Sequence, residues 1–577
     1  MRILFVYPSD NRTFNSGISS LSAVLKRGGH ETALYWTSGF DAASFDQRMA
    51  TFRPDLVAVS AVTNQFPLAA RLIERAKSST GKPVILGGIH ATLAPQEVIG
   101  TPGLDALCVG EGEGALLDFV ERLAAGRPYD DIANLWIKTP AGIVRNPVRP
   151  LITDLDSLPD PDYEIFDYDI ILEETGILMV FANRGCPYKC NYCVNHSLLQ
   201  LYGPKSFVRF LSVGRLLSRI EELLRRFPRA QTLEFFDDTF ILNRRWLAEF
   251  AERYPAAVGR PFYCNVRADL VDKEVVRLLK KAGCVRVNMA VETGSECLRR
   301  EVLNKDVTDD DLKRAFGLFR KAGIRTYAHN MVGIPHETEE NILRSIALNR
   351  NLRVDDLQCW TFYPYPGTEA REVCLKNGWI VERGSVTVAG KNTLSSLDQP
   401  GIDYERVSYH FRTFRYRVLG DRAPKEEIPF DFMEAGGEES QMISGWHALE
   451  SDGTMAFRWT KPEARLYLRN SGKRGLAVLA NCFLPGPPPR LTIEAGERRV
   501  AEVESPQGRW GWIEADLPKS GESVLEIILR VDSPFPASRL NPLDLRLLGI
   551  AVAQVRLEDD RERRARRDKL NPASSRP

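Results

Sequence analysis

The chain has 577 residues, of which 44% are hydrophobic and 27% charged, so its composition is that of a globular protein. The length is too great for one ordinary domain and predicts about three. Lys and Arg total 77 and Asp and Glu total 76, and the net charge of +1 gives no electrostatic footprint for nucleic acid or for an anionic membrane surface.

The distribution of apolar residues and cysteines indicates a compartment. No apolar stretch reaches the ~20 residues that span a bilayer, and Met1–Tyr7 has the character of a buried strand rather than of a signal peptide. Ten cysteines in so long a chain are not the disulfide framework of a secreted protein. We therefore expect a cytoplasmic protein without a transmembrane segment or a nucleic-acid partner.

Residues 1–145 alternate short apolar runs with amphipathic stretches. This alternation predicts a doubly wound, Rossmann-like parallel sheet covered by helices. The expected strands are Ile3–Tyr7, Thr32–Trp36, Leu56–Ser60, Val84–Leu86 and Ala106–Val109. Ligands of such sheets bind at the carboxyl ends of the strands, so we expect a site there.

A proline-rich stretch over 146–175 predicts an extended linker, and βα alternation resumes over 176–400 with a longer repeat. Six expected strands alternate with helices such as Val213–Phe227, whose apolar residues share one face. The strands are Leu178–Ala182, Thr232–Phe236, Phe262–Val266, Val285–Val291, Arg325–Val332 and Leu357–Tyr363. Six consecutive units predict a partial (β/α)6 TIM-like barrel, with active residues at the carboxyl ends of its strands.

The remaining residues have a different pattern. A helical bridge is expected over 401–429, and strict apolar–polar alternation over 430–557 predicts an all-β, jelly-roll-like sandwich. Its tryptophans either stack on sugar rings, as in carbohydrate-binding jelly rolls, or fill the core and its rim. The basic tail 558–577 is expected to be disordered.

Three cysteines are crowded directly after the first barrel strand. Cys186, Cys190 and Cys193 have the spacing C-x3-C-x2-C, which can hold three irons of a [4Fe–4S] cluster and leave the fourth iron without a protein ligand. The alternative is a structural zinc ion completed by His196.

The segment 176–400 resembles the radical S-adenosylmethionine (SAM) superfamily, which carries a C-x3-C-x-aromatic-C loop after the first strand of a partial barrel. The resemblance implies a [4Fe–4S] cluster on the three cysteines and SAM bound at its open iron. The residues that match the SAM-binding segments are Tyr192, Asp237, Asp238, Glu292, Gly333 and Ile334, with Glu337 nearby. Either Asp237 or Asp238 would meet the amino group of SAM, unless Asp238 only caps the following helix.

The front domain resembles the cobalamin-binding domain of cobalamin-dependent (class B) radical SAM proteins. The resemblance implies cobalamin contacts at Ser60, Thr63, Gly87, Gly88, Gly110 and Glu111. Ordinary turn chemistry is the alternative for the glycines. The loop Ser9–Gly17 contains no histidine, so we expect cobalt without a histidine ligand, and we expect His90 to be a turn or pocket residue.

Together these features predict a radical SAM enzyme that transfers a methyl group from methylcobalamin to an unactivated substrate carbon, after a 5′-deoxyadenosyl radical has removed hydrogen. The substrate would be a small molecule, lipid or glycan, and the electron donor a flavodoxin or ferredoxin. Two alternatives stay open: a cyclase, rearrangement or oxidation enzyme with the same cofactors, and a zinc-stabilised carbohydrate-binding protein without redox chemistry.

Overall fold

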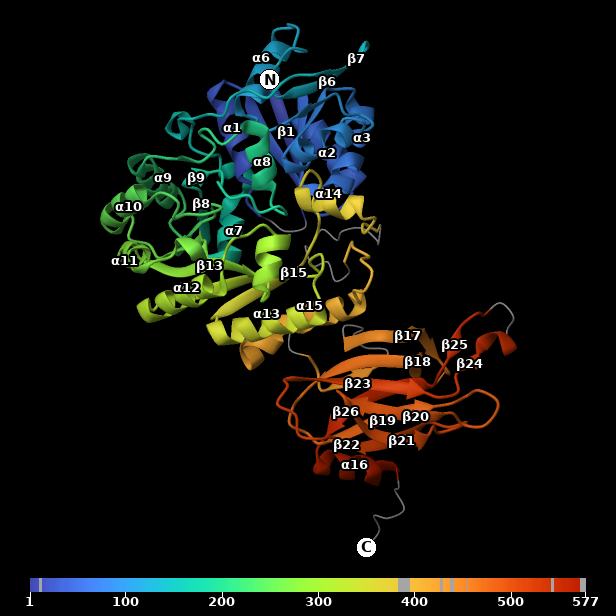
Figure 1. The fold of residues 1–577 in the computed structure, drawn as a ribbon. Coiled ribbons are helices and arrows are strands. Elements are labelled where there is room, and N and C mark those ends of the chain that lie inside the picture. Colours follow the sequence, from blue (N-terminus) through green and yellow to red (C-terminus); the bar gives the residue numbers. More distant parts are fainter. Residues whose placement is uncertain are drawn as a thin grey trace. The chain divides into compact units, whose positions relative to one another are not determined.

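The computed structural model describes residues 1–9, 13–381, 395–425, 429–435, 441–453, 455–540 and 544–570. The chain divides into two compact units, Met1–Ile402 and Asp403–Pro577 (Figure 1). Each unit has its own buried hydrophobic side chains. The first unit contains both α/β regions that the sequence predicts, and the second contains the all-β region.

The N-terminal sheet has seven strands in the order β2-β1-β3-β4-β5-β6-β7, of which the first five are parallel. The strands are β1 (Arg2–Pro8), β2 (Glu31–Thr37), β3 (Leu56–Ser60), β4 (Val84–Gly87), β5 (Ala106–Cys108), β6 (Leu135–Thr139) and β7 (Gly142–Arg145). The strand order reverses between β1 and β3, which is where doubly wound sheets open a ligand crevice. The antiparallel hairpin β6–β7 extends the predicted parallel sheet.

Helices cover both faces of this sheet. They are α1 (Ser16–Arg27), α2 (Ala42–Phe52), α3 (Phe66–Thr80), α4 (Ile89–Leu93), α5 (Pro95–Val98) and α6 (Glu113–Ala124). The near-continuous apolar strands follow from this double coverage, because Ile3–Val6 bury side chains toward two separate cores.

The stretch 146–175 was predicted to be an extended linker, but in the structure it is partly helical. It contains two 3-10 turns (Leu155–Ser157 and Glu164–Phe166) and helix α7 (Tyr168–Thr175). Tyr163 stacks on Phe14 with ring centroids 4.3 Å apart, and its hydroxyl donates to the Met179 carbonyl at 2.6 Å. These buried contacts pack the segment between the two α/β regions, which proline and acid content alone did not reveal.

The central region is an open sheet of six parallel strands in the order β15-β14-β13-β12-β11-β8, which confirms the predicted partial barrel. The strands are β8 (Ile177–Val180), β11 (Thr232–Phe235), β12 (Phe262–Val266), β13 (Cys284–Glu292), β14 (Arg325–Val332) and β15 (Asp356–Thr361). A short antiparallel pair, β9 (Asn183–Arg184) and β10 (Arg209–Phe210), follows β8.

The barrel helices begin and end at chemically suitable residues. They are α8 (Val194–Tyr202), α9 (Val213–Arg226), α10 (Arg244–Ala257), α11 (Lys273–Ala282), α12 (Asp309–Ala322), α13 (Glu339–Leu352) and α14 (Glu369–Lys376). Helix α12, for example, starts with a Thr308/Asp311 capping box and ends at Gly323.

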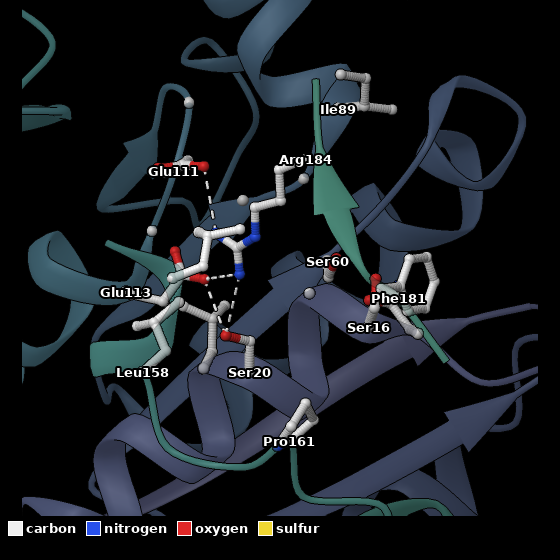
Figure 2. A pocket seen from close by; sticks show the side chains of 18 of the residues that line it. Ser16, Ser20, Ser60, Ile89, Glu111, Glu113, Leu158, Pro161, Phe181 and Arg184 are labelled. Atoms are coloured by element: carbon white, nitrogen blue, oxygen red, sulfur yellow. Dashed lines mark hydrogen bonds and ion pairs between the residues drawn. The ribbon is translucent and has the colours of Figure 1, made fainter. Parts of the chain in front are cut away.

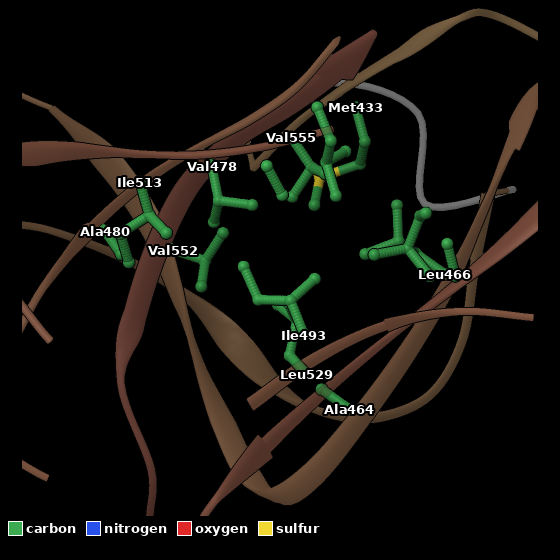
Figure 3. Close-up of a cluster of buried hydrophobic side chains, with 14 of the residues drawn as sticks. Met433, Ala464, Leu466, Val478, Ala480, Ile493, Ile513, Leu529, Val552 and Val555 are labelled. Carbon is green, nitrogen blue, oxygen red and sulfur yellow. The ribbon is translucent and has the colours of Figure 1, made fainter. Parts of the chain in front are cut away.

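The second unit begins with helix α15 (Tyr404–Leu419), inside the predicted helical bridge, and continues as an all-β region. The strands are β16 (Phe432–Glu434), β17 (Met442–Ser451), β18 (Ala456–Arg469), β19 (Gly475–Asn481), β20 (Arg490–Ala495), β21 (Arg498–Glu504), β22 (Gly511–Asp516), β23 (Val524–Val531) and β26 (Ala551–Glu558), with the small pair β24 (Phe535–Pro536) and β25 (Leu547–Leu548). The nine larger strands form one antiparallel sheet around a large aliphatic cluster (Figure 3), and a second, smaller buried cluster contains Phe457 and Trp459. The strands β21 and β22, at opposite ends of the strand order, are in contact, so the sheet is nearly closed on itself.

The tryptophans of this region pack on the protein itself. Trp459 is buried, and the face of Trp512 is covered by the guanidinium groups of Arg566 and Arg556, at 4.6 and 4.9 Å from the ring centroid. The indole Nε1 of Trp446 donates to the Arg465 carbonyl at 2.9 Å. These contacts favour the packing interpretation over sugar stacking for these three residues.

The predicted disorder of 558–577 is wrong for its first part. Residues Asp560–Leu570 form helix α16, and 571–577 lie outside the described residues. Arg566, which is 6% exposed, pairs with Glu558 and Glu514 at 2.7 Å each. The basic run therefore has specific acidic partners on the sheet, which only the tertiary fold supplies. No helix among the described residues has the length and apolarity to cross a membrane.

Candidate cofactor and active site

A cavity of about 930 Å³ in the first unit is lined by the carboxyl ends of strands from both α/β regions. The N-terminal sheet contributes Ser60 and Gly87, and the barrel contributes Phe181 and Asp237. Figure 2 shows side chains of both regions around this space. The two strand-end sites that the sequence predicts separately are therefore walls of one cavity.

Most of the residues predicted to contact cobalamin line this cavity. Ser60, Gly87, Gly88, Gly110 and Glu111 belong to its wall. Thr63 does not, and its hydroxyl lies 3.3 Å from Nδ1 of His90. The prediction of Thr63 as a cofactor contact is therefore not supported by its position.

His90 is a buried packing residue. Its ring lies 4.3 Å from the Phe66 ring, burial lowers its pKa, and it is outside the cavity lining. We expected a turn or pocket residue, but His90 lies within helix α4 and outside the cavity wall, so its position supports neither part of that expectation. Of the loop Ser9–Gly17, residues 10–12 lie outside the described residues.

Gly110 lies against a side chain of the barrel, and the absence of a Cβ atom allows this close contact. Its φ is +85°, and a Cβ atom there would lie 1.8 Å from the Tyr202 hydroxyl of helix α8. The same hydroxyl accepts a hydrogen bond from the Glu111 backbone N–H at 2.8 Å. Gly110 therefore allows close contact between the front domain and the barrel, a role that turn chemistry did not reveal.

The carboxylate of Glu111 is held by two arginines. Arg209 donates to it at 2.8 and 3.0 Å, and Arg184 at 3.2 Å. Arg184 also pairs with Glu113 at 2.6 Å, and Ser20 donates to Glu113 at 2.8 Å (Figure 2). We call Glu111, Glu113, Arg184 and Arg209 the inter-domain ion cluster. Glu111 was predicted as a cobalamin contact, but its oxygens already have protein partners.

The electrostatics of this cluster are balanced. Burial alone would raise the pKa of Glu113, but the Arg184 guanidinium outweighs that effect, and the pKa lies below its ordinary value. Arg209 is 5% exposed and Glu113 7%, so each charge depends on its partners for compensation.

The three cysteines lie in the loop that begins two residues after Arg184. All ten cysteines of the chain are free thiols. Burial raises the pKa of Cys186, and it raises that of Cys193 to about 12, while the other cysteines of the loop add to both effects. Cys186 and Cys193 therefore share one enclosed loop in which burial disfavours their free thiolates.

Backbone contacts fix the shape of this loop. Gly185, with φ +88°, passes so close to the Phe207 carbonyl oxygen that a Cβ atom would lie 2.3 Å from it. Asn191 donates to the Val302 carbonyl at 2.5 Å, and Asn304 donates to the Lys189 carbonyl at 2.8 Å. The loop is therefore held against the segment that follows strand β13.

The donor set fits a cubane cluster. Within the part of the chain that the structure describes, no three His, Cys, Asp or Glu side chains are grouped to hold one metal ion. In a cubane each thiolate binds its own iron, so the thiolates need not share a single ion. His196 Nε2 lies 3.3 Å from the Gln200 amide nitrogen and 3.7 Å from Glu369, contacts that engage it away from the thiols. The three cysteines match the cluster better than they match a Cys3His zinc site.

The two neighbouring aspartates differ in their contacts. Asp237 accepts backbone N–H groups of Ala182 and Asn183 at 2.8 and 2.5 Å, and burial raises its pKa to about 7. Asp238 opens onto the cavity, interacts electrostatically with Cys186 and Cys193, and has a raised pKa because of its enclosure. Helix α10 is capped by Asn243, so Asp238 is not its cap.

Tyr192 and Glu292, predicted as separate SAM contacts, are direct neighbours. The Tyr192 hydroxyl donates to Glu292 at 2.6 Å, and Lys305 donates to the same oxygen at 2.7 Å. Burial would raise the pKa of Glu292, but Lys305 lowers it below the ordinary value. Glu292 has φ +64°, a strained conformation that is concentrated at functional sites.

The backbone of Gly333 and Ile334 is hydrogen-bonded to the Glu337 carboxyl group. Their backbone N–H groups donate to one oxygen of Glu337 at 2.7 and 3.3 Å. Burial raises the pKa of this carboxyl group to about 8. The two amides are therefore already bonded, and these residues can offer a ligand their carbonyl groups and surfaces only.

Sequence reasoning missed four charged residues of this region: Arg184, Arg209, Lys305 and Arg267. Arg184 stands in Asn183-Arg184-Gly185-Cys186, directly before the cysteine motif, and this closeness to Cys186 in the sequence could have suggested a role at the site. The others are far from the cysteines along the chain and come near only through the fold.

Comparison with known proteins gives the class of the protein. Residues 180–348 match the family model "Radical SAM superfamily", and residues 6–120 match the model "B12 binding domain". Residues 180–348 thus form a radical SAM domain and residues 6–120 a B12-binding domain in front of it, and the cofactors that these two domains imply are SAM, a [4Fe–4S] cluster and cobalamin.

Particular relatives support this class. The chain is 28% identical over 334 residues to an uncharacterized methyltransferase of Pyrococcus horikoshii, covering 57% of this chain and 71% of that protein. It is also 28% identical over 398 residues to the anaerobic magnesium-protoporphyrin IX monomethyl ester cyclase of Rubrivivax gelatinosus, covering 63% of this chain and 68% of that protein.

Two solved structures have the same fold. The radical SAM methyltransferase TsrM of Kitasatospora setae aligns with a TM-score of 0.54 and 19% identity, over 66% of this chain and 77% of its own. The cobalamin-dependent radical enzyme OxsB aligns with a TM-score of 0.57 and 16% identity, over 74% of this chain and 69% of its own.

The inter-domain ion cluster leads to a first prediction. Arg209→Met removes one of the two guanidinium groups that compensate the charge of the partly buried Glu111. We expect the free energy of unfolding of the first unit, measured in urea, to fall by on the order of 3 kcal/mol. Adding Glu111→Gln should recover part of the loss, with a coupling energy of about 1–3 kcal/mol. Arg229→Met is the control, since its pair with Glu173 is exposed and worth at most ~1 kcal/mol. Additive losses in the double variant would contradict the assignment.

Glu337 leads to a second prediction. Between the ordinary pKa of 4.5 and the raised pKa of about 8, the Glu337 carboxyl group is protonated in the folded chain and ionised in the unfolded chain. The contribution to stability is therefore full below the lower value and is lost as the pH rises toward the upper one. We expect the melting temperature of the apoprotein to fall less in Glu337→Gln than in the wild type between about pH 5 and pH 8.5. The control is Glu340→Gln, an exposed residue of α13; equal slopes in all three proteins would refute the prediction.

Proposed function

We propose that this protein is a cobalamin-dependent radical SAM methyltransferase that methylates an unactivated carbon of a small-molecule substrate. The observation that carries the proposal is the single cavity that the strand ends of the B12-binding domain and of the barrel line together. A methyl donor, a radical source and a substrate carbon must be held in one line for such a transfer, and positioning of this kind supplies much of the catalysis.

The chain's own residues have distinct parts in this proposal. Cys186, Cys190 and Cys193 would hold the cluster, and Asp238, which opens onto the cavity beside two of the thiols, would bind the amino group of SAM. Asp237 would instead hold the backbone of Ala182 and Asn183 in place. When bound, SAM, cluster and cobalamin supply the radical and the methyl group.

The residues around the ribose and adenine would orient SAM. Tyr192, Glu292 and Lys305 form one buried hydrogen-bonded group at the end of β13, with Oε1 of Glu292 shared by two donors. Gly333 and Ile334, held by Glu337, would present the adenine-side surface. Phe181 and Phe236 line the cavity and would exclude water from the reacting groups.

Ser60, Gly87 and Gly88 would border cobalamin on the front-domain side. Ser60 offers a hydroxyl group, and the two glycines offer backbone without side-chain bulk. We assign Gly110 and Glu111 to domain packing within the same wall, since Tyr202, Arg184 and Arg209 occupy their contacts.

The names of relatives favour methyl transfer and leave one alternative. A hopanoid C-3 methylase of Methylococcus capsulatus and a cytidylyl-2-hydroxyethylphosphonate methyltransferase of Streptomyces wedmorensis are similar to this chain, as are the cyclases. A cyclase or oxidation enzyme with the same cofactors is therefore the second candidate. A lipid or glycan substrate, a flavodoxin or ferredoxin donor, the cytoplasmic location and the domain limits 1–145, 176–400 and 430–557 remain part of the proposal.

The third prediction tests methyl transfer directly. Holoenzyme reduced with a flavodoxin system and given methyl-deuterated SAM should transfer the label to the bound corrinoid, because the proposal requires the two cofactors to meet at this cavity. S-adenosylhomocysteine and 5′-deoxyadenosine are quantified in the same sample. A corrinoid that never acquires the label while deoxyadenosine accumulates would exclude methyl transfer and favour the cyclase or oxidation candidate.

The fourth prediction separates cluster from zinc. We expect Cys190→Ala to lose the charge-transfer absorption of the anaerobically purified protein and most of its iron and sulfide. His196→Ala should keep all three, because His196 Nε2 contacts Gln200 at 3.3 Å and faces Glu369 at 3.7 Å. A colourless wild-type protein that contains zinc, or equal metal loss in both variants, would overturn the cluster assignment.

A further inference from the structure

Arg267 stands directly after strand β12 and reaches the cysteine loop from a different part of the barrel. Its Nη1 atom lies 3.6 Å from Sγ of Cys190, within hydrogen-bond distance for a sulfur acceptor. The two residues are 77 positions apart in the chain, and neither composition nor spacing links them.

Three further contacts fix the direction of this guanidinium group. It lies over the Tyr188 ring, 3.7 Å from the centroid, and it pairs with Asp269 through Nε at 2.8 Å. Its Nη2 atom donates to the Asp306 carbonyl at 3.3 Å. With a side chain only 9% exposed, Arg267 is held in one orientation, with one N–H group directed at the sulfur.

The contact has a defined electrostatic consequence. A thiolate that accepts an N–H bond from a cation is stabilised as an anion. The reduced form of an iron–sulfur cluster has one more negative charge than the oxidised form, and hydrogen bonds to the sulfurs therefore raise its reduction potential.

We propose that Arg267 is a positioning residue that raises the reduction potential of the cluster through its N–H bond to the Cys190 sulfur. The inference rests on the proposed function, because it takes Cys190 as a cluster ligand. The electron itself would come from the flavodoxin-type donor, and it would enter the cluster with no change in the protonation of Arg267.

The chain offers a matched control. Arg286, on the neighbouring strand β13, also stacks on a tyrosine, at 3.9 Å from the Tyr263 centroid, and it too faces a carboxylate, Glu234, at 3.8 Å. Within the described residues no sulfur accepts a hydrogen bond from the Arg286 guanidinium; Sγ of Cys284 donates instead to the Arg286 backbone carbonyl at 3.3 Å, a contact that does not involve the side chain. Arg286→Met therefore removes a half-buried cation, whose side chain is 29% exposed against 9% for Arg267, without removing the bond to the cysteine loop.

The experiment is a redox titration of the reconstituted holoenzyme, followed by the EPR signal of the reduced cluster. At a fixed solution potential we expect the ratio of reduced to oxidised cluster to fall about tenfold in Arg267→Met, which is 59 mV for a one-electron couple. Arg267→Lys keeps the positive charge but not the planar guanidinium donor, and we expect the ratio of reduced to oxidised cluster to fall about threefold in this variant. Arg286→Met should match the wild type.

Two outcomes overturn the proposal. A reduced fraction within twofold of the wild type in Arg267→Met, with iron and sulfide retained, would show that the contact does not tune the cluster. If that variant fails to retain iron, Arg267→Lys carries the measurement, and an unchanged ratio there would have the same meaning. A wild-type protein without any [4Fe–4S] signal would instead refute the proposed function, so the two failures are distinguishable.

Discussion

The inter-domain ion cluster is the constraint on which the arrangement of the first unit depends. Glu111 and Glu113 follow the last parallel strand of the front sheet, whereas Arg184 and Arg209 belong to the β9–β10 pair of the barrel. Burying four charges is unfavourable unless each meets its partner, so this geometry tolerates little sliding of one sheet past the other. Arg184 is also two residues from Cys186, and the same contacts therefore position the cysteine loop relative to the front domain.

The cavity is a direct result of that constraint. Parallel strands present their carboxyl ends on one edge, and the ion cluster brings two such edges to face one another. The cavity wall then combines small residues from one sheet, such as Gly87 and Gly88, with the carboxylate of Asp238 and the ring of Phe236 from the other. Around it, buried carboxyl groups have different tasks: Asp237 and Glu337 accept backbone N–H groups, and Glu292 is bonded by a tyrosine and a lysine.

The second unit has a core independent of this site. Its nine-stranded sheet encloses a large cluster of aliphatic side chains, and helix α16 adds the buried pair Arg566–Glu558. Alternation along the strands predicted an all-β region but not its closure, because hydrogen bonding between distant strands such as β19 and β26 is set by the tertiary fold. Helix α16 was likewise not predicted, because its charged sequence has no clear apolar face. Its position depends on ion pairs of Arg566 with Glu514 and Glu558.

The order of the three regions, the six-strand barrel and the cysteine loop could all be predicted from the residues, because hydrophobic periodicity and motif spacing are local properties. The sequence also identified the strand ends that carry Ser60, Gly87, Asp238 and Glu292. Only the tertiary structure decided that Gly110 accommodates Tyr202, that Thr63 bonds His90 instead of lining the cavity, and that Arg267 reaches Cys190. These contacts join residues between 27 and 92 positions apart, and no local pattern records such a distance, because side-chain partners are chosen by how whole sheets and helices pack.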